Sequence, residues 1–316
     1  ILPIASEYFG VIIYGVPFLA FAMMGNPTIR AEGKPKFAMY AMMVPAVLNV
    51  VLDIIFIKVF DWGMWGAGLA TSLSYASCGL YILYFFLSSK SELKIIPKNF
   101  KLDFKIVREI VELGGVSIVR QGAISILMIV LNFSLFKYGG EISIAVFGII
   151  NRVMMFALSP VLGVSQGFLP VAGFNIGAQK NDRVKETIKK AIWFGSVLGT
   201  IVFIGVLFFK EEVIWIFTND ATLLAQTPDA MFIVFLATPI VTMQLIGSAY
   251  FQAAGKAMPA LFLTLLKQGF LLIPLAYILP KYFGIIGVWW SFPIADVLST
   301  IITVWVLKRE VNRNLK

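Results

Sequence analysis

Nine long apolar stretches dominate the 316-residue sequence. Each is close to the length of about 20 apolar residues that an α-helix needs to cross the hydrocarbon core of a bilayer. Only 14% of the residues are charged, against about 25% in a typical soluble domain. The sequence therefore predicts an all-α, polytopic membrane protein with nine transmembrane helices. The stretches lie near residues 8–29, 37–60, 66–88, 114–136, 143–175, 188–209, 230–254, 259–280 and 285–307.

The second stretch carries two polar residues, Asn49 and Asp53, near its middle. A carboxylate at that depth costs about 2.5–3.5 kcal/mol on insertion scales, so it normally faces protein or a wet cavity. Residues four apart share one face of a helix, which brings the two side chains together. They offer oxygen ligands to a small hard cation, or a proton site with a hydrogen-bonding neighbour. The structural alternative is a buried aspartate that only ties helices together.

The residue composition excludes several other kinds of chemistry. The chain has no His and a single Cys, Cys78, which excludes the usual zinc sites and any intramolecular disulfide. No nucleotide-binding loop or nucleophile elbow is present in the sequence. We therefore expect no enzyme activity and no cofactor.

The distribution of basic residues predicts the orientation in the membrane. Of the 26 Lys and Arg residues, 19 lie in one set of loops and only four in the opposite set. Loops rich in Lys and Arg stay in the cytoplasm, so the C-terminus is expected to be cytoplasmic. The net charge of +9 is then an orientation signal, and no nucleic-acid partner is expected.

An internal repeat relates the first third of the chain to its last third. Both copies keep the same orientation by the charge count, as in the parallel repeats of several transporters. The second copy is preceded by three further apolar stretches, and the counterpart of Gly114 would fall before Ile1. We therefore expect three more helices ahead of this sequence, in a parent of twelve. Pro17, Gly25, Gly33 and Lys34 recur as Pro239, Gly247, Gly255 and Lys256, and Gly63 and Gly66 recur as Gly284 and Gly287.

Several segments resemble the multidrug and toxic compound extrusion (MATE) transporters, of the bacterial type. They include RAEGKPK at residues 30–36, LNVVLD at 48–53, WGAGLAT at 65–71 and FQAAGKA at 251–257. The most specific segment, residues 150–185, ends in NIGAQKNDRVK. The resemblance covers nearly the whole chain, and the helices expected ahead of it would be the family's first three.

The resemblance implies a twelve-helix transporter of two lobes. Residues 1–88 would then form part of the N-terminal lobe (helices 4–6 of the parent), residues 89–113 a cytoplasmic connector, and residues 114–316 the C-terminal lobe (helices 7–12). It also implies a cation-coupled antiporter in the plasma (inner) membrane of a prokaryote, which exports cationic amphipathic drugs or metabolites by alternating access. A monomer embedded in the lipid bilayer is expected. The alternative is a flippase for a lipid-linked saccharide, from the same wider superfamily.

The resemblance further implies a coupling site for H⁺ or Na⁺ at Asn49, Asp53 and Thr71. A Na⁺ ion at Asp53 is the only metal expected. Polar residues within the apolar stretches of the C-terminal lobe are candidates for the substrate cavity, because such groups face cavities or pair with one another. Lys267 and Asp296 lie in adjacent stretches and are candidates for an internal ion pair, with substrate contact and cation coupling as the alternatives. The cavity candidates are Gln121, Asn132, Asn151, Arg152, Gln244, Gln268 and Asp296.

Overall fold

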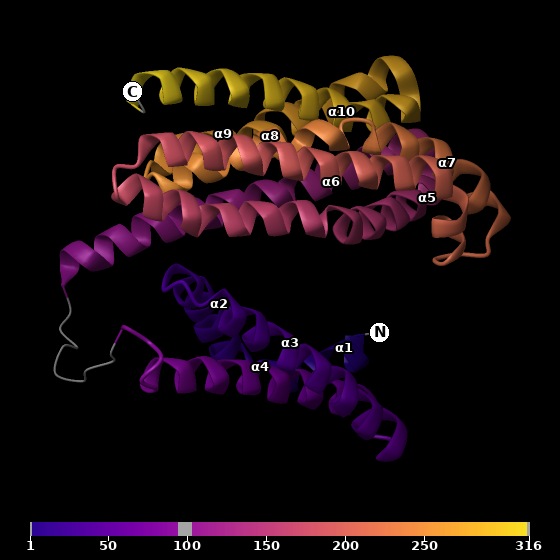
Figure 1. Ribbon diagram of the computed structural model, residues 1–316. Coiled ribbons are helices and arrows are strands. Elements are labelled where there is room, and N and C mark those ends of the chain that lie inside the picture. The colour runs from indigo at the N-terminus through magenta and orange to yellow at the C-terminus, as the bar shows by residue number, and fades with distance from the viewer. Residues whose placement is uncertain (1, 94–102, 315–316) are drawn as a thin grey trace. The chain divides into compact units, whose positions relative to one another are not determined.

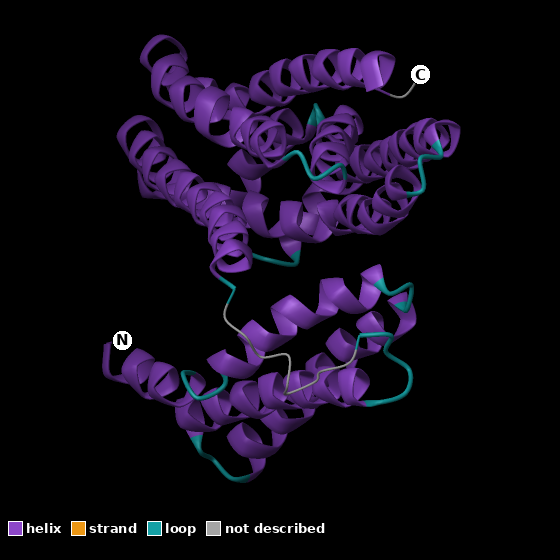
Figure 2. Cartoon of the chain, turned by 90° about the vertical axis from the view of Figure 1, so that its left-hand side faces the viewer, coloured by secondary structure: helices purple, strands orange, loops and turns teal. Residues whose placement is uncertain are grey.

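Helices make up nearly all of the computed structural model, which describes residues 2–93 and 103–314 (Figures 1 and 2). No strand occurs in these two ranges, and the predicted all-α class is confirmed. Two short π-helices, η1 (Ile54–Val59) and η3 (Leu266–Leu272), adjoin the α-helices. The α-helices are α1 (Leu2–Ile12), α2 (Val16–Ala31), α3 (Pro35–Asp53), α4 (Gly63–Leu87), α5 (Phe104–Gly177), α6 (Asn181–Trp215), α7 (Ala221–Phe235), α8 (Thr238–Ala253), α9 (Ala257–Leu265) and α10 (Ile273–Asn314).

The apolar helices have the lengths of membrane-spanning segments. Five helical segments are long and apolar enough on their own, and the bent pairs α1–α2 and α7–α8, with angles of 55° and 46°, bring the total to seven. Two of the long segments are divided by a glycine in the left-handed region, Gly140 (φ 69°) and Gly284 (φ 58°), a conformation that glycine adopts without steric cost. Within the described ranges, nine helical passes result.

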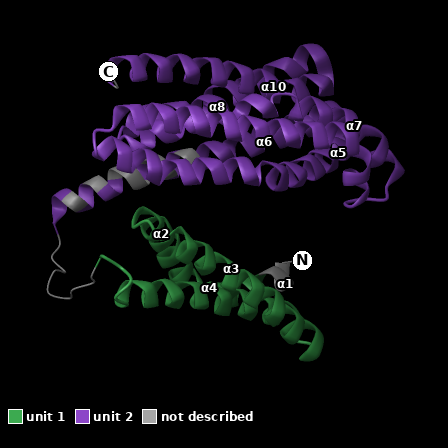
Figure 3. Cartoon of the chain, in the orientation of Figure 1, with its two compact units in different colours: residues 1–102 green, residues 103–316 purple. Residues whose placement is uncertain are grey.

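The chain forms two compact units, residues 1–102 and 103–316 (Figure 3). The segment predicted as a connector, residues 89–113, straddles this boundary. Its residues 94–102 lie outside the described part of the chain, and α5 begins within it at Phe104. The division into lobes and connector stays a prediction.

Small residues set the helix packing of the first unit. A Cβ atom added at Gly25 of α2 would lie 2.4 Å from Cγ2 of Ile82 in α4, so only glycine permits this approach of the two helices. The side-chain amide of Asn26 donates to the carbonyl oxygen of Ala38 at 2.7 Å and ties α2 to α3. The apolar core around these contacts comprises Ala22, Ile29, Ala38, Ala41, Ile82, Phe85 and Phe86.

The second unit packs α5 to α10 around two apolar clusters. One gathers the middle of α5 with α6, α7 and α10, around Leu131, Ile150, Met231 and Phe292. The other joins the end of α5 to α6, α8, α9 and α10. Just before the candidate span formed by α7 and α8, Asp220 begins α7 because its carboxylate accepts hydrogen bonds from the backbone N–H groups of Leu223 and Thr222, at 3.2 and 2.8 Å. These bonds lower the pKa of the Asp220 carboxyl.

The repeat in the sequence is also visible in the geometry. Gly33 and Gly255 have φ values of 75° and 70° at equivalent turns, and Gly63 and Gly284 have 52° and 58°. A Cβ atom at Gly247 would meet Cγ2 of Thr303 at 2.3 Å, as one at Gly25 would meet Ile82. Ser248 donates to the carbonyl oxygen of Ala260 at 3.3 Å, where Asn26 donates to Ala38 in the first copy. The two copies therefore share turns, close approaches and a helix-joining hydrogen bond.

Candidate functional site

The predicted coupling residues lie on α3 and α4 in the first unit. The side-chain amide of Asn49 donates to the hydroxyl oxygen of Thr71 at 3.5 Å. That hydroxyl in turn donates to the carbonyl oxygen of Ala67, 2.9 Å away in its own helix. Because the amide nitrogen of Asn49 is the donor, its amide oxygen remains available as a ligand. The structure thus brings Asn49 and Thr71 together across the contact of α3 with α4.

Asp53 lies one helical turn after Asn49, on the same face of α3. Its side chain is half-buried, and its Oδ1 atom is buried without a hydrogen-bond partner in the described part of the chain. Nor does Asp53 belong to any ion pair identified among the described residues. A buried carboxylate oxygen without a partner carries a large free-energy cost, which a bound cation or proton would relieve.

Asp53 is also the last residue of α3 before the backbone changes to the π-helix η1. The backbone N–H of Phe60 bonds the carbonyl oxygen of Ile55, five residues earlier, at 3.0 Å. π-Helical backbone is rare and occurs frequently at functional sites. The wider turn begins at Ile54, so the carboxylate stands at the end of the regular helix.

The oxygen atoms of Asn49, Asp53 and Thr71 are ligands of the kind that bind a small hard cation. A carboxylate, an amide oxygen and a hydroxyl are the oxygen groups that such ions prefer, and the partnerless Oδ1 of Asp53 provides the charge. Among the described residues no group of three His, Cys, Asp or Glu side chains is placed to hold a metal ion. The three side chains therefore supply a carboxylate, an amide oxygen and a hydroxyl oxygen, which are ligand types suited to Na⁺, and the carboxylate can also take up a proton.

A cavity of about 200 Å³ lies within the second unit, between α5, α7, α8, η3 and α10. Three of the predicted cavity residues line it: Asn151, Gln268 and Asp296. The wall also holds Lys267, whose ammonium group pairs with the carboxylate of Asp296. This ion pair confirms the pairing predicted from the two adjacent apolar stretches. The Oε1 atom of Gln268 is buried without a hydrogen-bond partner among the described residues, so the cavity has unused acceptor capacity.

The remaining predicted cavity residues lie elsewhere. Gln121, Asn132 and Arg152 have exposed side chains and do not line the cavity. Gln244 is buried, and its amide donates to the carbonyl oxygen of Leu263 at 3.2 Å, which joins α8 to α9. Lys267 was not among the predicted cavity residues, although its ionisable side chain in an apolar stretch is a signal that could have identified it. The apolar wall, which includes Met128, Met154 and Phe292, carries no sequence signal that separates it from core.

A protein-family model and a bacterial export protein each match most of this chain. A protein-family model described as MatE matches residues 1–55 and 117–278. The multidrug export protein MepA of Staphylococcus aureus (strain bovine RF122 / ET3-1) is 28% identical over 313 residues, which cover 97% of this chain and 68% of MepA.

Solved transporter structures are similar to nearly the whole chain. A transporter of the MOP superfamily from Pyrococcus furiosus, described as having a binding pocket of reversed polarity, matches with a TM-score of 0.92 and 27% identity, over 98% of this chain and 70% of that one. A MATE family multidrug resistance transporter in an outward-facing conformation matches with a TM-score of 0.90 and 27% identity, over 97% of this chain and 69% of that one.

Proposed function

Because the chain belongs to the MatE family, a family of multi-pass membrane transporters, we propose that it exports cationic amphipathic drugs or metabolites in exchange for H⁺ or Na⁺. The relatives described above are named as export proteins or transporters, and this supports export rather than catalysis. The name of MepA, a multidrug export protein, supports the exporter over the lipid-linked saccharide flippase. The distribution of Lys and Arg supports a cytoplasmic C-terminus in this proposal.

The partnerless carboxylate of Asp53 carries the coupling part of the proposal. An unpaired acid inside an apolar span normally marks an ion or proton pathway. A bound cation shifts a protein between two conformations only by binding one of them more tightly. The π-helix η1, directly after Asp53, gives the backbone a local irregularity at which the spacing of the three oxygen groups can change. Cation binding at Asn49, Asp53 and Thr71 would then be tied to the direction in which the substrate site opens.

Transport by the purified full-length protein tests this function. In proteoliposomes, an imposed H⁺ or Na⁺ gradient is expected to drive a fluorescent cationic dye such as ethidium against its own concentration gradient. Dissipation of the active gradient with an ionophore should stop the transport. Protein-free vesicles are the control. Movement of a labelled lipid-linked saccharide without dye transport would contradict the proposal and support the flippase.

Asn49→Ala and Thr71→Ala are each expected to weaken coupled efflux by roughly three- to tenfold. Each removes one neutral oxygen and about 0.5–1.5 kcal/mol of hydrogen-bond free energy, while the charge of Asp53 remains. The measurement is the initial rate of dye efflux as a function of the cation gradient. Ser77→Ala is the matched control, because Ser77 lies on the same helix as Thr71 and its hydroxyl only donates to the carbonyl oxygen of Ser74. An equal loss in the control would assign the effect to helix packing.

A further inference from the structure

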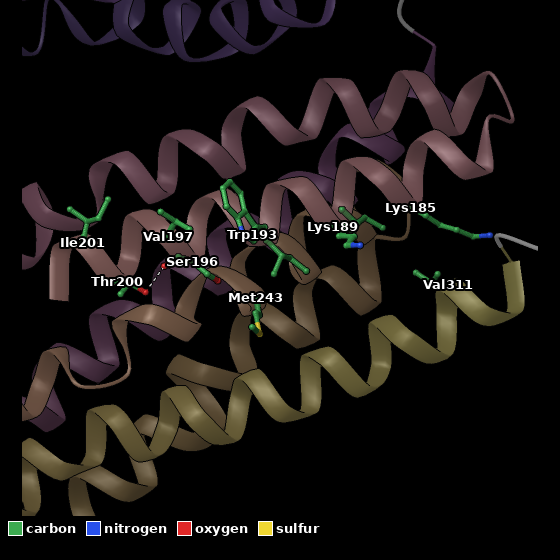
Figure 4. A pocket seen from close by; sticks show the side chains of 11 residues that line it. Lys185, Lys189, Trp193, Ser196, Val197, Thr200, Ile201, Met243 and Val311 are labelled. Carbon is green, nitrogen blue, oxygen red and sulfur yellow. Dashed lines mark hydrogen bonds between the residues drawn. The ribbon is translucent and has the colours of Figure 1, made fainter. Parts of the chain in front are cut away.

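A groove of about 730 Å³ runs along the second unit, between α6, α8 and α10 (Figure 4). Its floor and walls are mainly side chains of α6, with Met243 from α8 and Val311 from α10. Figure 4 shows Lys185 and Lys189 toward one end of the groove and Ile201 at the other. The groove lies wholly within one unit and is separate from the cavity at Lys267 and Asp296.

The side chains on the α6 side of the groove change from charged to apolar along the helix. Lys185, Lys189, Trp193, Val197 and Ile201 follow one another at intervals of four residues, so they form one continuous ridge along the helix. The ridge changes from two ammonium groups, through an indole, to aliphatic side chains. Residues of these three kinds match the headgroup, the interface and the acyl region of a membrane leaflet in the same order.

The sequence of α6 places the change in chemistry at the membrane surface. Residues 191–209 contain no charged side chain, and 19 residues of helix span about 28 Å, close to the hydrocarbon thickness of about 30 Å. Lys189 lies two residues before this apolar run, and Trp193 lies within its first turn. Trp residues are enriched at this depth.

Among the described residues, no close ion pair neutralises the two ammonium groups at the mouth of the groove. Lys185 lies 3.7 Å from the carboxylate of Asp182, a contact between exposed groups of the kind that contributes little. Lys189 is in none of the ion pairs formed by described residues. The nearest acid on the same turn, Glu186, pairs instead with Lys190 at 2.7 Å. The mouth therefore keeps a positive charge.

We propose that this groove binds an anionic phospholipid of the cytoplasmic leaflet. The lipid phosphate lies between the ammonium groups of Lys185 and Lys189, and an acyl chain lies along Trp193, Val197 and Ile201 against Met243. The charge selects the occupant: a cationic amphipathic substrate is repelled by the two lysines, whereas the cytoplasmic leaflet supplies anionic lipid. This site goes beyond the transport function and does not depend on it.

Lipid binding to the delipidated full-length protein in detergent, measured by native mass spectrometry, tests the proposal. Phosphatidylglycerol is expected to bind more tightly than phosphatidylcholine with the same acyl chains. Lys185→Gln/Lys189→Gln should lower the affinity for phosphatidylglycerol about 30-fold, since each Lys near an anionic surface contributes about 1 kcal/mol, and should leave phosphatidylcholine unaffected. The matched control is Lys137→Gln/Lys281→Gln, which removes the same charge outside the groove and should change neither affinity.

Fluorescence quenching locates the bound lipid independently. Phosphatidylglycerol with brominated acyl chains should quench part of the tryptophan fluorescence, and Trp193→Phe should remove that part. Equal affinity for the two lipids, an unchanged affinity in the double lysine variant, or unchanged quenching in Trp193→Phe would each overturn the assignment. Quenching at Trp193 by brominated phosphatidylcholine of equal strength would show a general lipid-facing surface instead.

Discussion

Replacing Asp53 by Asn in the full-length protein is expected to reduce gradient-driven efflux to the rate of protein-free vesicles. The substitution keeps the size of the side chain and one acceptor oxygen, but it replaces the other oxygen with a donor NH2 group and removes the charge. Only neutral oxygens then remain for a cation, and no carboxylate remains for a proton. A site that no longer distinguishes the two conformations by cation affinity cannot bias their equilibrium. Insertion should be unaffected, because a neutral amide crosses the bilayer more easily than a carboxylate.

The internal repeat strengthens this expectation. The offset between the two copies maps Asp53 onto Leu275 or Pro274, so the second copy holds no acid at the equivalent position. The second copy nevertheless forms the same turns and close approaches as the first. A carboxylate that the fold does not require in one copy is hard to explain as scaffold in the other.

Efflux from energised vesicles, with matched protein amounts, gives the measurement. Asp61→Asn is the control: Asp61 is an exposed acid just after η1, with φ 53°, a backbone region that Asn tolerates. This control should transport at the wild-type rate. Wild-type efflux by the Asp53→Asn variant would contradict the assignment of Asp53 as the coupling residue. Asp296 would then be the next acid to test.

Much of this fold was predictable because helices that lie in a membrane must have long apolar sequences. The apolar stretches predicted the nine helical passes, and the recurring glycines predicted turns that in fact share left-handed backbone geometry at Gly33 and Gly255. Two ionisable residues in adjacent stretches predicted the pair of Lys267 with Asp296. Each of these features depends on one local property of the sequence. The helices depend on apolarity, the turns on the backbone freedom of glycine, and the ion pair on charge.

The rotation of each helix about its axis was not predictable in the same way. Gln121 and Gln244 carry the same side chain in apolar stretches, yet the first is exposed and the second is buried against α9. Contacts between segments far apart in the sequence decide which face is covered. The π-helix after Asp53 likewise has no residue composition that marks it in the sequence. The polar residues in the apolar stretches could therefore be predicted from the sequence. Which of them line a cavity depends on helix packing and could not.

The ion pair of Lys267 with Asp296 leads to the second large expected effect. The side chain of Asp296 is only 8% exposed and that of Lys267 23% exposed. Lys267→Met leaves a buried carboxylate without its partner, and breaking a buried pair in this way costs about 3–5 kcal/mol. We expect a marked fall in the unfolding temperature of the detergent-solubilised protein. Asp296→Asn should cost less, since the side chain of Lys267 is long and more exposed than that of Asp296 and can move its charge away from the buried position.

Removal of both charges separates a packing effect from an electrostatic one. Lys267→Met/Asp296→Leu replaces the pair with apolar groups of similar size, a change that is often neutral or stabilising, so this double variant should unfold well above Lys267→Met. Lys210→Met is the matched control: Lys210 lies 3.7 Å from Asp229, whose side chain is 90% exposed, and such a pair contributes about 0–1 kcal/mol. If the double variant is as unstable as Lys267→Met, the aliphatic stem of Lys267, and not its charge, stabilises the unit. If instead the double variant recovers stability but loses export of the dye, the pair is retained for its role at the cavity.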